Sequence, residues 1–352
     1  MYHTFTYRVG FALALFLWTT ALPNGFSQTG PPAADSLFEI GAYADAAQRY
    51  EQALAALPED TAPARRARLL LRLGECRYRQ GDYRRARSRF EAALAAARRS
   101  DDAALEAEGG YRYGRALTRL SEYERGEGEL RAAIDIYRRL GKEAEPSAAD
   151  ALASLGYLYL LNNRLEECEA VQQEALRIRR AALGDEHLDV AASYNSLGNL
   201  YSEKRDFDLA RDYYRQCLAI RERRLSEPDI LLGSVYYNLA RLEARQGRPQ
   251  AAMRYNQRAL ENQRAIDPDH ARTGDTYLLM GQLYVDIGDY PAGRDCFLET
   301  LRIFRRAFGE RQERVGTAYN LLANIYRLSG DYEEARRYAE RGLDVTRAAV
   351  GP

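Results

Sequence analysis

The sequence predicts an all-α fold, a solenoid of about seven to eight antiparallel helical hairpins. The first observation is a repeat. Six segments align at 73–83, 113–123, 155–165, 197–207, 280–290 and 322–332, with a looser seventh at 239–249 and an incomplete copy at 41–58. Their spacing is 40 to 42 residues. The second observation is that the apolar residues of each copy follow a helical period, and nowhere the period of two that is typical of strands. A unit repeated at a fixed period is the signature of a solenoid.

Each copy contains the apolar stripes of two helices. In the fifth copy the first stripe consists of Tyr194, Leu197, Gly198 and Tyr201. After a turn at 205–207, the second stripe consists of Ala210, Tyr214, Cys217 and Leu218. A turn this short forces the two helices to lie antiparallel and adjacent.

Small residues recur at two positions of the repeat, which indicates where the paired helices approach most closely. In the first helix they are Gly74, Gly114, Gly156, Gly198, Ala240, Gly281 and Ala323. In the second helix they are Ala46, Ala86, Gly126, Cys168, Ala210, Ala252, Gly293 and Ala335. The pattern has departures: Glu243 stands where Tyr is expected, and Gln172, Asn256 and Ala339 replace a large residue. We expect looser packing there, or a polar spot that faces a partner.

This combination of small residues, Tyr, turn and Ala-x-x-x-aromatic-x-x-Ala resembles the tetratricopeptide repeat over almost all of residues 28–352. The units are longer than the ordinary repeat and resemble the 42-residue kinesin-light-chain type, above all at 182–201 and 307–326. The resemblance implies a right-handed superhelix whose concave inner surface is lined mainly by first helices. It also implies that the chain binds a protein or peptide there.

The predicted domain organisation is a signal peptide followed by the repeats. Residues 9–22 form an apolar run after one basic residue, and small residues at 25–27 suit cleavage after Ser27, so residues 1–27 read as a secretory signal peptide. An uncleaved N-terminal membrane anchor is the alternative. The repeats of the solenoid, 28–352, are expected near 28–66, 67–106, 107–148, 149–190, 191–232, 233–273, 274–315 and 316–352.

The composition and motifs argue against several classes of function. The 51 basic and 51 acidic side chains cancel, whereas nucleic-acid binders usually carry a basic excess. Nucleophile, P-loop and HExxH motifs are absent, so we predict no enzyme activity and no cofactor. The three histidines lack zinc-ligand spacing, so no metal site is expected. The four cysteines are widely spaced, and we expect buried thiols, with disulfides left open.

The concave surface is the predicted binding site. Helical geometry places residues three before and one after the small position of the first helix on that surface. Two repeats carry Asn at both places: Asn195 with Asn199, and Asn320 with Asn324. In kinesin-light-chain-like repeats, similarly placed Asn side chains bind a peptide backbone, because an amide is both donor and acceptor. The alternative is that these Asn residues are solvated or bond their own helix. Side-chain selectivity is assigned to Tyr157, Tyr237, Arg241 and Gln282, and Arg115 is a further predicted peptide-binding residue.

Arg115 also belongs to a basic patch with Arg68, Arg72, Arg79, Arg112 and Arg119. The patch resembles the basic clamps by which some tetratricopeptide domains hold a carboxylate terminus. The alternative, which we favour, is a solvated face paired with Glu75 and Glu108.

We therefore predict a non-catalytic scaffold of the bacterial cell envelope, periplasmic or secreted, that binds an extended peptide or a partner protein. Two alternatives stay open. The first is a structural component that assembles or forms a homo-oligomer through an uncapped C-terminal repeat, where Leu343 and Val345 are expected to be exposed. The second is the ligand-sensing part of a signalling system whose effector is a separate chain.

Overall fold

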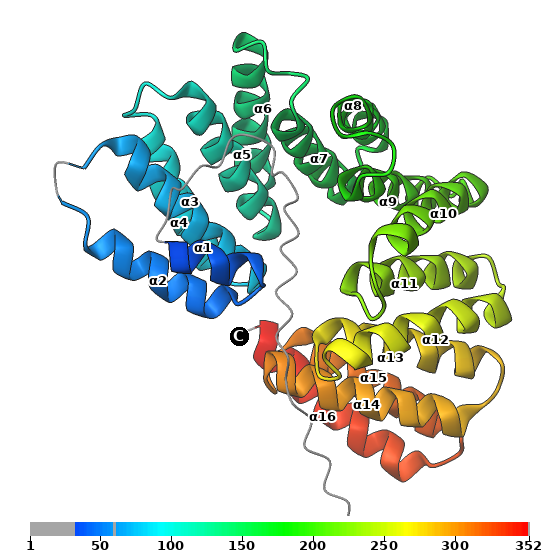
Figure 1. Ribbon diagram of the computed structural model, residues 1–352. Helices are drawn as coiled ribbons and strands as arrows, with labels where there is room; N and C mark the ends of the chain where they lie inside the picture. The colour runs from blue at the N-terminus through cyan, green and yellow to red at the C-terminus, as the bar shows by residue number, and fades with distance from the viewer. Residues whose placement is uncertain (1–31, 59–60, 351–352) are drawn as a thin grey trace, which may run out of the picture. The chain divides into compact units, whose positions relative to one another are not determined.

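The computed structural model describes residues 32–58 and 61–350, which form sixteen α-helices and no strand. In chain order the helices are α1 (Pro32–Glu39), α2 (Tyr43–Ala55), α3 (Pro63–Arg79), α4 (Tyr83–Ala97), α5 (Ala103–Arg119), α6 (Tyr123–Arg139), α7 (Pro146–Leu161), α8 (Leu165–Leu183), α9 (Leu188–Glu203), α10 (Phe207–Arg224), α11 (Ile230–Arg245), α12 (Pro249–Ile266), α13 (Ala271–Asp286), α14 (Tyr290–Phe308), α15 (Glu313–Leu328) and α16 (Tyr332–Val350). Each odd-numbered helix pairs with the next as a hairpin, so the predicted solenoid of helical hairpins is confirmed (Figure 1).

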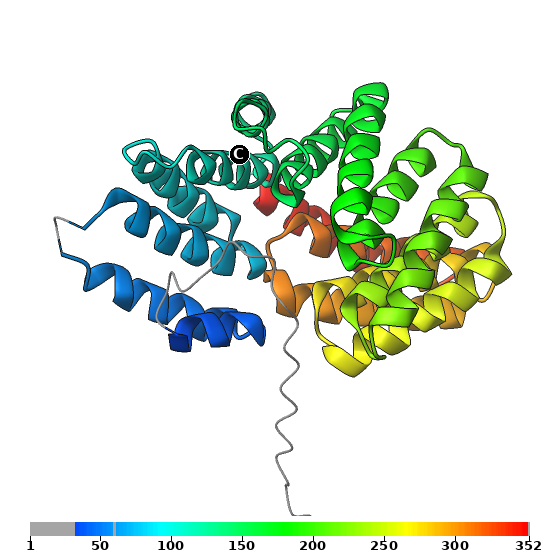
Figure 2. The ribbon, with the colours of Figure 1, turned by 45° about the horizontal axis from the view of Figure 1, so that its top comes forward.

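The chain divides into two compact units. Unit 1 ends at Arg99 and contains α1 to α4, and unit 2 begins at Ser100 and contains α5 to α16. Within unit 2 the hairpins follow one another in chain order (Figures 1 and 2).

The turn inside each hairpin follows from two adjacent residues. The first adopts a left-handed backbone, as at Gly288, where φ is 83°. Glycine has no Cβ and adopts this conformation without strain. The next residue is often Asp, whose carboxylate caps the second helix; Asp289 accepts a hydrogen bond from the N–H of Ala292. At Arg205 the chain takes the same turn without glycine, with φ of 63°.

The two helices of a hairpin touch at the small residues that the sequence singles out. A Cβ at Gly198 would lie 2.5 Å from a ring carbon of Tyr214, and one at Gly281 would lie 2.5 Å from a ring carbon of Phe297. The two repeats with Ala at this position instead carry Asn256 and Ala339 opposite it. Around the buried Ala240 and Asn256, a smaller partner accompanies the larger residue, which conserves the volume of a close-packed interior. Ala339, by contrast, is exposed.

Two polar departures from the repeat pattern, Glu243 and Asn256, are buried rather than directed at a partner. Glu243 is 4% exposed and pairs with Arg211 of the preceding hairpin at 2.8 Å. Asn256 is fully buried, and its Nδ2 donates to the carbonyl of Thr276 at 2.9 Å. Each polar group therefore joins two neighbouring hairpins.

Successive hairpins of unit 2 stack through the same pairs of helices. Each second helix packs on the first helix of the next hairpin, and first helices also contact each other, α5 with α7, α7 with α9, α9 with α11 and α11 with α13. We call the surface formed by α5, α7, α9, α11, α13 and α15 the first-helix face. The array bends toward this face, since first helices are the ones brought together across hairpins.

Two expectations concern the ends of the chain. The signal peptide or anchor at 1–27 lies outside the described residues. Among the helices that are described, none is long and apolar enough to cross a membrane. On α16, Leu343 is 50% exposed as expected, whereas Val345 is 7% exposed and packs in the core with Tyr319, so the expected exposure of Val345 is wrong.

Candidate functional site

Asn195 and Asn199 lie half-buried on α9, in the middle of the first-helix face. The hydroxyl of Tyr214 donates to Oδ1 of Asn199 at 2.7 Å. Nδ2 of Asn238, on α11, donates to Oδ1 of Asn195 at 2.9 Å. Both amides are held in place by their oxygens, so their Nδ2 hydrogens remain as the donors, one helical turn apart.

The second asparagine pair has different surroundings. Asn320 and Asn324 are exposed on α15. Oδ1 of Asn320 occupies the space that a Cβ at Gly342 of α16 would take, so this side chain folds onto its own hairpin. Oδ1 of Asn324 accepts a hydrogen bond from Arg327 at 2.8 Å. The hairpins α11–α12 and α13–α14 separate this pair from the pair on α9.

Aromatic residues occupy the first helices on either side of α9. Tyr157 of α7 is half-buried, and its hydroxyl accepts from Nη1 of Arg119 at 2.9 Å. The Arg119 guanidinium lies 4.7 Å from the centroid of that ring, a cation–π distance. Tyr237 of α11 is half-buried as well, and burial raises the pKa of its hydroxyl. The guanidinium of Arg241 lies 6.0 Å from its ring centroid.

Two predicted site residues lie farther along the same face. Arg115 is half-buried on α5, and Gln282 is exposed on α13. The structure therefore places Tyr157, Asn195, Asn199, Tyr237 and Arg241 on three adjacent first helices. The remaining predicted residues lie on helices at either side.

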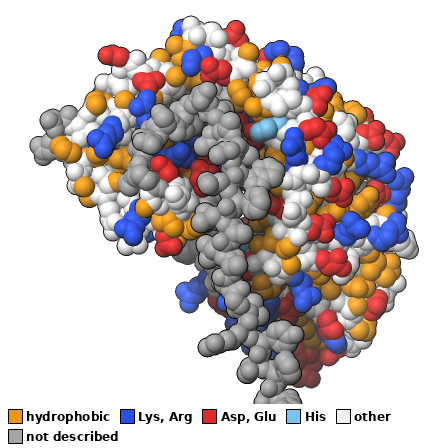
Figure 3. All heavy atoms as spheres, in the orientation of Figure 1, with side chains coloured by type: hydrophobic (Ala, Val, Ile, Leu, Met, Phe, Trp, Pro, Cys, Tyr) orange, Lys and Arg blue, Asp and Glu red, His pale blue; other side chains and the backbone are white. Residues whose placement is uncertain are grey.

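The basic patch consists of arginines with acidic neighbours. In unit 1, Nε of Arg79 lies 2.8 Å from Glu75. In unit 2, Nη2 of Arg112 lies 2.9 Å from Glu108. On the visible face, basic and acidic side chains are interspersed (Figure 3). These contacts agree with an internally paired face, in which Glu75 itself is buried.

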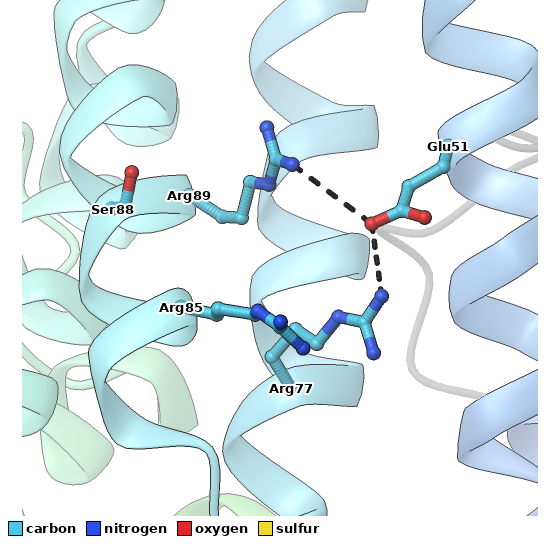
Figure 4. A pocket seen from close by; sticks show the side chains of 5 residues that line it. All are labelled: Glu51, Arg77, Arg85, Ser88 and Arg89. Carbon is cyan, nitrogen blue, oxygen red and sulfur yellow. Dashed lines mark hydrogen bonds and ion pairs between the residues drawn. The ribbon is translucent and has the colours of Figure 1, made fainter.

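Unit 1 contains a polar pocket of about 440 Å³ lined by Glu51, Arg77, Arg85, Ser88 and Arg89 (Figure 4). Oε1 of Glu51 lies 2.9 Å from Arg77 and 3.9 Å from Arg89. Arg85 is paired with Asp82 at 3.4 Å, and its side chain is 72% exposed. Since solvated ion pairs account for these charges, the pocket shows no feature that selects a ligand.

Sequence reasoning missed two buried arginines at the same position of successive second helices. Arg179, on α8, is 7% exposed and donates to Asp150 at 2.6 Å, to Ser193 at 2.8 Å and to the carbonyl of Asp189 at 3.3 Å. Arg221, on α10, is 5% exposed and donates to the carbonyl of Leu231 at 2.7 Å. The sequence contains a signal for them, because an arginine recurs at the repeat spacing within the otherwise apolar stripe of the second helix.

Protein-family models of one and the same repeat match successive parts of the chain. The model for the tetratricopeptide repeat matches residues 147–223, 231–292 and 272–348, which together exceed half of the chain. Two further models of the same repeat match residues 32–83 and 69–104.

Curated relatives match about half of the chain. Proteins named clustered mitochondria protein homolog, from Coccidioides immitis and Emericella nidulans, are 27% identical over 175 residues and 26% identical over 180 residues. These matches cover 48% and 49% of this chain, but 14% of each relative.

Solved structures of similar fold cover most of the chain. The apo quorum sensor NprR from B. thuringiensis has a TM-score of 0.63 at 15% identity, with 90% of this chain and 86% of that chain covered. A Rap protein complexed with competence and sporulation factor has a TM-score of 0.66 at 15% identity, with 90% and 83% covered. A kinesin light chain-like protein from P. anserina has a TM-score of 0.50 at 18% identity, with 57% and 95% covered. At these identities the likeness concerns the fold alone.

The relatives overturn one expectation from the sequence. The chain was expected in the bacterial periplasm, secreted, or tethered to the envelope. The curated relatives are fungal proteins named for mitochondria, so this expected localisation is wrong. The repeat type, by contrast, is supported by family models and by solved structures alike: the chain belongs to the tetratricopeptide repeat family.

Proposed function

We propose that the chain is a non-catalytic scaffold that binds an extended segment of a partner protein across the first-helix face of unit 2. The observation that carries the proposal is the amide pair on α9. With both Oδ1 atoms engaged inside the protein, Asn195 and Asn199 direct two Nδ2 donors at a ligand from fixed positions. Donors held in place in advance lose little conformational entropy when a peptide carbonyl binds them.

The flanking aromatic residues support the same site. Tyr157 on α7 and Tyr237 on α11 offer rigid apolar surface beside the amides, and Arg119 and Arg241 lie against their rings. Aromatic residues and arginine are the side chains most enriched at the energetic centres of protein interfaces. Backbone bonds to the amides would hold a peptide, and the rings would select among its side chains.

A peptide selected from a random library displayed on phage tests this proposal. The decisive variant is Asn195→Asp with Asn199→Asp, because aspartate keeps the acceptor oxygens for Asn238 and Tyr214 and removes the donors, while it also adds two negative charges. We expect affinity to fall at least about 10-fold, the loss of two hydrogen bonds worth about 1 kcal/mol each.

The matched control is the double change Asn320→Asp with Asn324→Asp, which alters charge equally on an exposed helix three hairpins away. Affinity within about twofold of the native value is expected for this control. Equal losses in both double variants would show that charge, rather than the α9 amides, governs binding. Unchanged binding in both would exclude the α9 site.

A second candidate function is self-association through α16. Tyr332 and Leu343 are 72% and 50% exposed, and residues eleven apart on a helix share one face. Light scattering over a range of concentrations tests it: a mass that stays monomeric, or a dimer that persists in Leu343→Glu, would exclude this surface.

A further inference from the structure

The buried arginines of α8 and α10 occupy equivalent places in successive repeats. Nη1 of Arg179 donates to the carbonyl of Asp189 near the start of α9, and Nη1 of Arg221 donates to the carbonyl of Leu231 near the start of α11. Asp189 and Leu231 are themselves one repeat apart, as are the two arginines. The same side chain therefore reaches the same point of the next hairpin in both repeats.

The two sites differ in what else they offer the guanidinium. Arg179 has the carboxylate of Asp150 and the hydroxyl of Ser193. One repeat later those positions are Ala192 and Val235. Among residues 32–58 and 61–350, Arg221 is left with the single hydrogen bond to Leu231. The Nε atoms of Arg179 and Arg221 are both buried without an acceptor, so the two sites differ in the missing carboxylate and hydroxyl.

A buried charge in this condition is costly. Arg221 is 5% exposed, and burial lowers the pKa of its guanidinium. Arginine side chains remain charged in proteins. A buried charge is normally retained only with a partner. Asp229 is the acidic group that favours the charged form of Arg221, but its Oδ1 already caps α11 by accepting from the N–H groups of Leu231 and Leu232.

A second arginine beside this site, the exposed Arg272 of α13, has a hydroxyl partner where the next repeat has a carboxylate. Arg314, on α15, forms an ion pair with Asp275 of the preceding hairpin. Arg272 occupies the equivalent place on α13, but its partner is the hydroxyl of Ser234, at 3.1 Å. The charges of Arg272 and Arg221 repel each other. Arg221 bonds the carbonyl of Leu231 in the first turn of α11, and Arg272 bonds Ser234 at the start of the second turn. Two cations therefore lie near the start of α11, whereas the equivalent Arg179 and Arg314 each have an aspartate partner.

We propose that Arg221 and Arg272 form a subsite for an aspartate or glutamate side chain of the bound polypeptide. This inference rests on the proposed function, and it adds the chemistry that the ligand must carry. The ligand would supply to Arg221 the carboxylate that Asp150 supplies to Arg179. Leu231 and Arg272 are exposed, so a ligand can reach the first turn of α11. Two turns beyond Leu231 on α11, Asn238 holds Asn195, which places the subsite about 10 Å along the helix from the amide pair.

The decisive variant is Ala192→Asp, which restores within the protein the carboxylate that Asp150 provides one repeat earlier. Ala192→Asn is the matched control, since it has the same size and no charge. A peptide selected from the phage library on the native chain is synthesised in two forms, with its acidic residue and with the corresponding amide, and both affinities are measured by calorimetry.

On the native chain and on Ala192→Asn, the acidic peptide is expected to bind at least about 10-fold more tightly than the amide form, because a hydrogen bond to a charged group is the stronger kind. On Ala192→Asp the two forms should differ by less than about twofold, as the internal carboxylate now neutralises Arg221. Arg221→Gln, which retains a donor for the Leu231 carbonyl, should lose the preference in the same way and serves if Ala192→Asp does not fold.

Equal affinities of the two peptide forms on the native chain would overturn the subsite while leaving the proposed function intact. A preference that persists in both Ala192→Asp and Arg221→Gln would also overturn it, because the acid would then bind elsewhere. Failure to select any peptide would instead refute the proposed function, and the subsite with it.

Discussion

The close contact between Gly198 and Tyr214 permits a quantitative test of how the hairpins are packed. A Cβ at position 198 would lie 2.5 Å from Cε1 of Tyr214, whereas ordinary contacts begin at 3.4 Å. Tyr214 is 3% exposed and its hydroxyl is held by Asn199, so the ring has little freedom to retreat. Gly198→Ala therefore forces a shift of about 1 Å in a close-packed interior.

The expected magnitude has two parts. Overpacking of this kind costs about 1–3 kcal/mol. The helix propensity of alanine over glycine returns about 1 kcal/mol. Gly128→Ala on α6 isolates the second part, since nothing lies within 4 Å of a Cβ there. We expect Gly128→Ala to stabilise unit 2 by about 0.5–1 kcal/mol and Gly198→Ala to fall about 1–3 kcal/mol below it.

A double-mutant cycle identifies the cause. Tyr214→Asn is the second change, because Gly198→Ala made within it gives the residue pair that occurs naturally at Ala240 and Asn256. In that background Gly198→Ala should no longer destabilise, which corresponds to a coupling of about 1–3 kcal/mol. The free energies of unfolding come from urea titrations followed by far-UV circular dichroism.

Either of two results would refute this account of the packing. The first is that the two Gly→Ala variants shift the free energy of unfolding equally. The second is a coupling below about 0.5 kcal/mol, the level expected of independent sites.

Three further predictions concern other parts of unit 2. Arg211→Met should cost about 1–3 kcal/mol because it leaves the buried carboxylate of Glu243 with only the longer contact to Arg248, at 3.4 Å. The double variant with Glu243→Met should recover most of that loss in urea titrations, and an equally unstable double variant would contradict it. Burial lowers the pKa of His270, whose neutral Nδ1 accepts the N–H of Arg272 at the start of α13. The unfolded state therefore binds the proton more readily, and the free energy of unfolding should fall as the pH drops below about 6.5. His270→Asn, which caps without titrating, should flatten that part of the pH profile, and an unchanged profile would show that another group is responsible. Burial raises the pKa of the Cys296 thiol to about 11, but it is the one half-buried cysteine of four. A disulfide reagent should modify Cys296 slowly and before the other three, so a first phase that survives in Cys296→Ser would refute the order.

The hairpin architecture follows from the sequence, because its signals are local. Each helix is marked by an apolar stripe of helical period and each turn by a residue such as Gly288 followed by the capping Asp289. These signals recur at a constant spacing, so neighbouring hairpins stack in the same way. The small residues at one position of the first helix, such as Gly198 and Ala240, also predicted where the two helices of a hairpin approach closely.

The environment of each polar side chain was decided by the tertiary structure, because its partners come from another helix or another repeat. Asn199 and Asn324 occupy the same position of the repeat, yet one is locked by Tyr214 and the other is exposed. Glu243 read as a polar departure and proved to be a buried partner of Arg211. Arg221 is unusual only by comparison with Arg179, since what distinguishes them is a carboxylate from Asp150 on a different helix. Sequence periodicity determines which face a residue occupies, but the balance of charge at that face depends on contacts between helices that only the folded chain brings together.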